Sequence, residues 1–117
     1  ATQKIKMSVK ELASAADFDE FVAQETITVV KICAKWCGSC QQSAPQFEAL
    51  AAELDGQASL GSVDVEDNKE VSDDKERVGI IRMLPTFVLY KGGERVKSVS
   101  YYGDMYAIQA AVEGLAE

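Results

Sequence analysis

The segment TITVVKIC (Thr26–Cys33) constrains the fold more than any other part of the chain. It is β-branched and mostly apolar at odd and even positions alike, which is the pattern of a strand buried on both faces. Such a strand needs neighbours in a sheet and a layer of helices over each face. We therefore expect Thr26–Cys33 to be a central strand of an α/β domain.

The other apolar periodicities predict helices and strands on both sides of this strand along the chain. The expected helices run from Ser14 or Asp17 to Gln24, Cys37 to Leu54, Lys69 to Val78 and Met105 to Leu115. The expected strands are Ile5–Val9, Ser59–Val65, Pro85–Tyr90 and Arg95–Tyr101, with a hairpin turn at Lys91-Gly92-Gly93-Glu94. This order predicts one domain over residues 1–117, with a central mixed β-sheet flanked by helices on both faces.

Charge and apolar content narrow the function classes. The formal net charge is −7, which argues against binding to nucleic acid or to anionic membrane surfaces. No apolar stretch is long enough to cross a bilayer, and the first residues show no signal-peptide core, so we expect a cytoplasmic protein. Seven acids fall within Asp64–Glu76; they form either a solvated surface or a docking patch for a basic partner.

The three cysteines lie close together as C-x-x-x-C-x-x-C, at Cys33, Cys37 and Cys40. Two interpretations are open: a triad that holds an iron–sulfur cluster, or a redox C-x-x-C pair with a bystander. The chain has no histidine, so Cys–His catalysis and Cys₂His₂ zinc sites are excluded. A zinc site would need carboxylates as the remaining ligands.

Local geometry favours the cysteine pair. If Cys37 opens a helix, the Cβ atoms of Cys37 and Cys40 lie roughly 5–6 Å apart, which is close to the requirement for a disulfide. Cys33 sits in the preceding strand, and at ~3.3 Å per residue its Cα could be roughly 13 Å from that of Cys37. A radical-type cluster would also need a much larger barrel. We therefore expect Cys33 to be a small core residue, and we expect no metal or cofactor.

The start of a helix also suits thiol chemistry. Unpaired backbone N–H groups and the positive end of the helix dipole stabilise a thiolate there. Cys37 is expected to attack a substrate disulfide, and Cys40, one turn deeper, to resolve the mixed disulfide.

These motifs together resemble the thioredoxin family along the whole chain. The stretch AKWCGSC matches the family's active site, Pro45 its helix-kinking proline, and MLPTFVLYKGG (Met83–Gly93) its cis-proline strand and hairpin. The resemblance implies a thioredoxin-like fold and thiol–disulfide exchange on protein disulfide substrates. It also implies that the peptide bond before Pro85 is cis. A trans proline at the start of a strand is the alternative.

The resemblance also implies a substrate-binding surface around the dithiol. Trp36, Gly38 and Ser39 would surround Cys37, Leu84 would offer its backbone to an extended peptide, and Gly103 would lie in the last substrate-facing loop. Trp36 would be a partly exposed lid; a core aromatic is the alternative.

Several residues depart from the family pattern. Lys31 stands where the family has a buried acid that accepts a proton from the resolving thiol, and Ser62 replaces the lysine that pairs with that acid. Ser39 stands where most thioredoxins have proline. We expect slower exchange and a less reducing dithiol than in a standard thioredoxin, with Lys31 as a modulator. The alternative is that Lys31 extends its amine to the end of the strand and has no chemical role.

These departures allow a second class of function. The chain is also similar, more weakly, to the thioredoxin-like light chains of flagellar outer-arm dynein. That resemblance implies a subunit docked on a large partner in a motor complex, located in a flagellar or ciliary axoneme, with a structural or redox-sensing role. A domain of a disulfide isomerase is disfavoured, because the Gly-His dipeptide usual between isomerase cysteines is absent.

Overall fold

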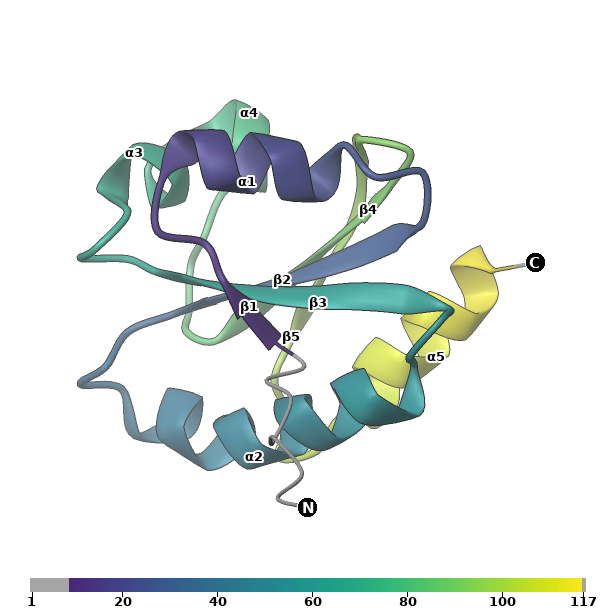
Figure 1. The fold of residues 1–117 in the computed structure, drawn as a ribbon. Helices are drawn as coiled ribbons and strands as arrows, with labels where there is room; N and C mark the ends of the chain where they lie inside the picture. Colours follow the sequence, from purple (N-terminus) through teal and green to yellow (C-terminus); the bar gives the residue numbers. More distant parts are fainter. Residues whose placement is uncertain (1–8, 117) are drawn as a thin grey trace, which may run out of the picture.

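A computed structural model of the chain, which describes residues 9–116, contains one five-stranded sheet in the order β1-β3-β2-β4-β5 (Figure 1). The strands are β1 (Val9–Glu11), β2 (Ile27–Cys33), β3 (Ala58–Asp64), β4 (Thr86–Lys91) and β5 (Glu94–Ser100). The helices are α1 (Ala15–Val22), α2 (Gly38–Glu53), α3 (Lys69–Ser72), α4 (Lys75–Val78) and α5 (Tyr106–Leu115).

The expected central position of β2 is confirmed. β2 pairs in parallel with β3 and antiparallel with β4, β1 is parallel to β3, and β5 is antiparallel to β4. Six of the seven residues of β2 are buried, as a strand covered on both faces requires. The sheet is therefore mixed, as predicted.

Helices cover both faces of the sheet, as Figure 1 shows with α1, α3 and α4 on one side and α2 and α5 on the other. The two faces have separate apolar cores. One core joins Phe47 of α2 and Ile108 of α5 to the sheet, and the other joins Phe18 of α1 to Val71 of α3 and Val78 of α4. The α2 core anchors the helix that begins at the cysteine pair.

The prediction of a single acidic helix over Lys69–Val78 is wrong, because the structure has two short helices there, α3 and α4. The backbone leaves the helical conformation at Asp74 and becomes extended there. The Asp74 carboxylate caps α4 by accepting a hydrogen bond from the Glu76 N–H group at 2.9 Å. An aspartate side chain that caps a new helix competes with continuation of the old one. The strand predicted at Ile5–Val9 lies outside the described residues except for Val9, which begins β1.

The predicted hairpin is confirmed. β4 and β5 are joined by Gly92 and Gly93, both with positive φ, which is the conformation of the tight turns that match strand twist. This hairpin places β5 at one edge of the sheet.

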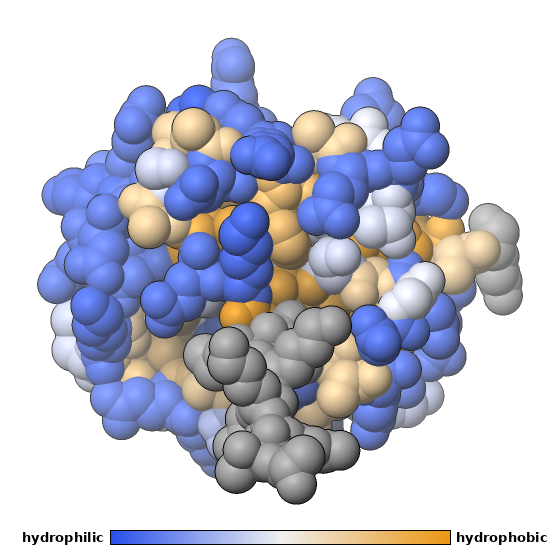
Figure 2. Space-filling model, in the orientation of Figure 1, coloured by the Kyte–Doolittle hydropathy of each residue, from blue (hydrophilic) through white to orange (hydrophobic). Residues whose placement is uncertain are grey.

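Hydrophilic side chains cover most of the face drawn in Figure 2, in keeping with the high charge of the chain. Within the described residues, no helix has the length and apolar composition needed to cross a membrane.

Candidate functional site

Cys37 is the residue that caps the start of α2. Its backbone is extended, and its Sγ accepts a hydrogen bond from the Cys40 N–H group at 3.3 Å. The chain turns into this position through a hydrogen bond from the Cys37 N–H group to the Ala34 carbonyl at 3.1 Å. Both cysteines are free thiols here. The predicted placement of the pair at a helix start is therefore found in the structure.

The two thiols of the pair differ sharply in environment. The pKa of Cys37 is lowered, first by the hydrogen bond from the Cys40 thiol and then by the backbone N–H groups of Cys40 and Ser39. Cys40 is only 4 % exposed. Burial, followed by its hydrogen bond to Cys37 and then by the Cys37 charge, raises its pKa to about 12. Consequently Cys37 is the thiol that ionises first, while Cys40 holds its proton.

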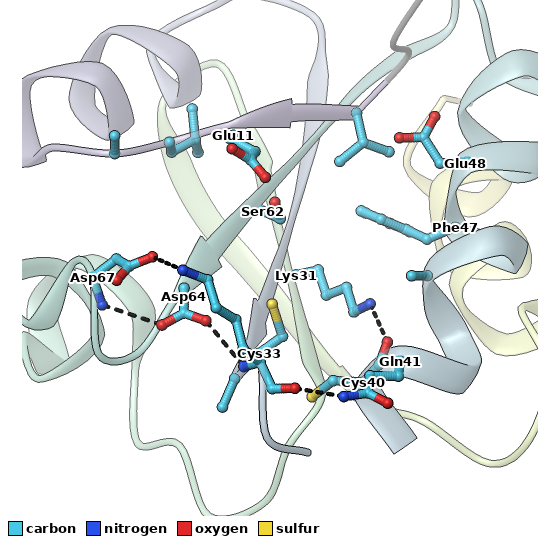
Figure 3. Close-up of a pocket in the computed structure, with 16 residues that line it drawn as sticks. Glu11, Lys31, Cys33, Cys40, Gln41, Phe47, Glu48, Ser62, Asp64 and Asp67 are labelled. Carbon is cyan, nitrogen blue, oxygen red and sulfur yellow. Dashed lines mark hydrogen bonds and ion pairs between the residues drawn. The ribbon is translucent and has the colours of Figure 1, made fainter. Parts of the chain in front are cut away.

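Lys31 projects from β2 toward the first turn of α2 (Figure 3). Its side chain is buried, with 4 % exposure, and its Nζ donates a hydrogen bond to the Cys40 carbonyl at 2.8 Å. The same carbonyl accepts a hydrogen bond from Ser43 Oγ at 3.1 Å. Burial lowers the pKa of Lys31, although the nearby thiols act in the opposite direction. The amine therefore lies inside the protein, bonded to the first turn of α2, and the role of Lys31 as a modulator stays a prediction.

Cys33 lies at the end of β2 and is half-buried, so its predicted role as a small core residue is only partly right. Its thiol donates a weak hydrogen bond to the Val63 carbonyl at 3.5 Å, and burial raises its pKa. It lines a cavity of about 380 Å³ together with Lys31 and Cys40 (Figure 3). No group of three or more His, Cys, Asp or Glu residues within residues 9–116 is placed to hold a metal ion.

The Leu84–Pro85 segment lies against the cysteine pair. The peptide bond before Pro85 is cis, as the family resemblance predicts. The Cys37 thiol is 3.8 Å from the Leu84 carbonyl oxygen, to which it donates. Pro85 is buried and Leu84 half-buried. The Cys37 sulfur and the Leu84 carbonyl oxygen thus lie next to each other.

The other predicted binding residues differ in their exposure and in their hydrogen bonds. Trp36 is 66 % exposed, so it is not a core aromatic. Gly38 and Ser39 are exposed in the first turn of α2. Gly103 has φ +95°, a backbone conformation suited to glycine, and its carbonyl accepts a hydrogen bond from Gln46 of α2 at 3.4 Å.

Two acids that support the site were not recognised in the sequence. Asp64 accepts hydrogen bonds from the N–H groups of Lys35, Glu66 and Asp67, which fastens the loop before Cys37 to the end of β3. Glu66 accepts a hydrogen bond from Trp36 Nε1 at 2.8 Å. The pattern of an aspartate followed by a turn could have identified Asp64. Its contact with Lys35 could not be seen locally.

Comparisons with known proteins agree with this geometry. The Thioredoxin family model matches residues 8–113. Thioredoxin-1 of Schizosaccharomyces pombe is 31% identical over 91 residues, which cover 78% of this chain and 84% of that protein. The thioredoxin of Staphylococcus haemolyticus is 34% identical over 84 residues, covering 72% of this chain and 76% of the relative.

Solved structures give the same result. The thioredoxin of Plasmodium falciparum has a TM-score of 0.78 and 31% identity, and the match covers 91% of this chain and 98% of that protein's chain. The thioredoxin of Fasciola hepatica has a TM-score of 0.79 and 30% identity with the same coverage. A cysteine pair at the start of a helix, a cis proline beside it and a matching family model lead to one assignment. The chain belongs to the thioredoxin family of thiol–disulfide oxidoreductases.

Proposed function

We propose that this protein reduces protein disulfides by thiol–disulfide exchange, with Cys37 as the attacking thiol and Cys40 as the resolving thiol. The observation that carries the proposal is the contrast within the pair: Cys37 is partly exposed and caps α2, whereas Cys40 is buried behind it. Membership of the thioredoxin family supports the same reaction class.

In the first step, the Cys37 thiolate attacks one sulfur of a substrate disulfide. The substrate S–S bond breaks, and its electron pair leaves on the other sulfur, which takes a proton from water. The lowered pKa of Cys37 increases the fraction of thiolate at neutral pH.

In the second step, Cys40 gives its proton to water and its thiolate attacks the sulfur of Cys37. The S–S bond between Cys37 and the substrate breaks, the substrate sulfur leaves with the electron pair, and a Cys37–Cys40 disulfide remains. The substrate gains two electrons and the protein loses two. The negative charge on Cys37 contributes to the raised pKa of Cys40. Because the mixed disulfide removes that charge, it favours ionisation of Cys40 at the moment when the thiolate is needed.

Binding of the substrate would use the surface around Cys37. The Leu84 carbonyl faces the reacting sulfur, and backbone groups of this kind suit an extended peptide irrespective of its sequence. Trp36 adds an exposed aromatic surface beside the cysteines. Gly38, Ser39, Pro85 and Gly103 remain predicted contact residues.

The test is reduction of insulin by the purified protein with dithiothreitol as the electron source. We expect Cys37→Ser to abolish turnover. Cys40→Ser, first reduced, then freed of dithiothreitol and mixed with insulin, should accumulate a mixed disulfide on Cys37, identified by mass spectrometry. Cys33→Ala is the matched control and should retain turnover. Full activity of Cys37→Ser would contradict the proposal.

The docked-subunit alternative, in an axonemal motor or another large assembly, is supported by none of these observations and stays a prediction. A docked subunit should copurify with its large partner in a fixed stoichiometry, and this measurement would test the alternative.

A further inference from the structure

A groove beside the Leu84–Pro85 bond collects positive charge in a protein whose net charge is −7. Its volume is about 610 Å³, and it is lined by α4, the segment 79–83 and β5. Lys75, Arg82 and Arg95 line it, and none of the described residues in its wall is acidic. The cavity beneath Cys40 has a different character, since four of its lining residues are acids.

The cations of the groove form no ion pair with an acidic side chain of the described residues. Ion pairs within residues 9–116 join Lys35 to Asp67, and Arg77 to Asp19 and Asp74. The groove cations take part in none of these pairs. The groove therefore presents three cationic side chains that form no ion pair with the described residues.

Arg95 is held in place by backbone rather than by an acid. Its Nη2 donates a weak hydrogen bond to the Lys75 carbonyl at 3.5 Å. A Cβ atom at Gly79 would lie 2.7 Å from Arg95 Nη1, so the guanidinium group packs directly over the glycine. These contacts place the guanidinium over Gly79 and leave donors free for a carboxylate, which arginine can bind through two parallel N–H groups.

The groove also has an apolar part. Ile80 is 61 % exposed and Met83 is 54 % exposed, and both line the groove. Large apolar side chains exposed beside cations suit a peptide, which supplies aliphatic surface as well as carboxylates. Thr86 lines the same groove, and its hydroxyl donates to the Met83 carbonyl at 2.6 Å, which holds the two ends of this turn together.

The position of the groove connects it to the dithiol. Met83 and Thr86 flank the Leu84–Pro85 bond, and the Leu84 carbonyl oxygen is 3.8 Å from Cys37 Sγ. A peptide bonded to Cys37 and lying along Leu84 therefore has its neighbouring residues near the groove, because extended chain advances about 3.3 Å per residue.

We propose that this cationic groove selects protein disulfide substrates that carry acidic residues within a few positions of the reacting cysteine. The inference rests on the proposed function, because only a peptide engaged at Cys37 is placed beside the groove. The opposing net charge of the protein acts at long range, and salt screens it within about 8 Å at physiological ionic strength. Close to the surface, the groove cations dominate.

The test uses two peptides that are identical except for the residues flanking a single cysteine, which are glutamate in one and glutamine in the other. Each cysteine carries a 2-thiopyridyl leaving group, so absorbance of the released thiopyridone reports the reaction with the fully reduced protein. The small molecule 2,2′-dipyridyl disulfide reports the reactivity of the dithiol alone, and each peptide rate is divided by this rate for the same variant.

We expect the glutamate peptide to react about threefold to tenfold faster than the glutamine peptide at physiological ionic strength, as a few exposed ion pairs allow. High salt should abolish the difference. The double variant Arg82→Gln/Arg95→Gln should lose the preference. Lys97→Gln, which removes a cation of β5 outside the groove, should keep it.

Two failures are distinguishable. If dipyridyl disulfide reacts but the two peptides react equally, or if the double variant keeps the preference, the groove proposal is overturned while the proposed function stands. If dipyridyl disulfide does not react with Cys37, the proposed function fails, and the groove proposal fails with it.

Discussion

Lys31 Nζ and the Cys40 carbonyl oxygen are joined by a 2.8 Å hydrogen bond in the interior of the protein. A cationic group thus contacts the backbone of the buried thiol residue, at the position where the thioredoxin pattern has an acid. None of the ion pairs within residues 9–116 provides a carboxylate for Lys31. The protonated amine favours a thiolate at Cys37, but it is unfavourable to bury.

Lys31 should therefore make stability depend on pH. Its pKa in the folded protein is lowered from 10.5 by burial. Between that lowered pKa and 10.5, the unfolded chain holds the proton while the folded chain does not, so the free energy of unfolding rises with pH in this window. Below the window both states are protonated, and the burial penalty is present in full. We expect wild-type protein to gain stability relative to Lys31→Met as pH increases through the window, measured by urea unfolding under reducing conditions.

The control for this experiment is Lys97→Met, which removes an exposed lysine of β5. Its stability difference from wild type should stay nearly constant with pH. A constant difference for Lys31→Met as well would show that Lys31 does not titrate differently in the folded state.

The reactivity of Cys37 should depend on the Cys40 thiol. The hydrogen bond from Cys40 is the largest cause of the lowered pKa of Cys37, so Cys40→Ala should move the midpoint of Cys37 alkylation to higher pH. The measurement is the rate of reaction with iodoacetamide against pH, followed at Cys37 by mass spectrometry. Cys33→Ala is the matched control and should leave the midpoint in place. Equal profiles for wild type and Cys40→Ala would refute the assignment.

Asp64→Ala should destabilise the protein. The carboxylate accepts three backbone hydrogen bonds, including the one from the Lys35 N–H group. Loss of these bonds should lower the free energy of unfolding by about 1–3 kcal/mol, toward the lower end because water reaches the site. Denaturant unfolding measures this, and Asp73→Ala provides a comparison at an exposed acid of the same segment. If the two variants lose the same stability, the proposed support of the loop is disproved.

Gly61→Ala should be destabilising because β3 passes close to α1. A Cβ atom there would lie 3.0 Å from Phe21 Cε2 and 3.2 Å from Leu12 Cδ1, and overpacking of this kind costs about 1–3 kcal/mol. Gly114→Ala provides the contrast, since a Cβ atom would meet nothing within 4 Å and alanine favours a helix by up to about 1 kcal/mol. Thermal unfolding should therefore shift down for the first variant and up for the second. A shift in the same direction for both would contradict this account.

The sequence predicted most of the fold because its signals are local and strong. The β-branched run of β2, the two glycines of the hairpin and the helical periodicity after Cys37 each determine one element without reference to the rest. The boundary at Asp74 was missed because a capping aspartate and an ordinary surface aspartate look alike in a charged segment.

The cysteine pair was also predictable, since the helical periodicity after Cys37 predicts a helix start there and the spacing then brings Cys40 next to Cys37. The remaining parts of the site depend on contacts between distant segments. The direction of the Lys31 amine is set by how α2 packs on β2, and the role of Asp64 is set by its approach to Lys35. Likewise, Lys75, Arg82 and Arg95 meet only when α4 and β5 are assembled around the segment between them.

The capping of α2 by a sulfur atom has a thermodynamic consequence. The N–H group of Cys40 stabilises the ionised form of Cys37, and whatever stabilises a free thiolate stabilises the dithiol state against its disulfide. The same interaction that makes Cys37 quick to react thus diminishes the driving force with which this protein gives up electrons. Speed and reducing power are opposed at this single helix end.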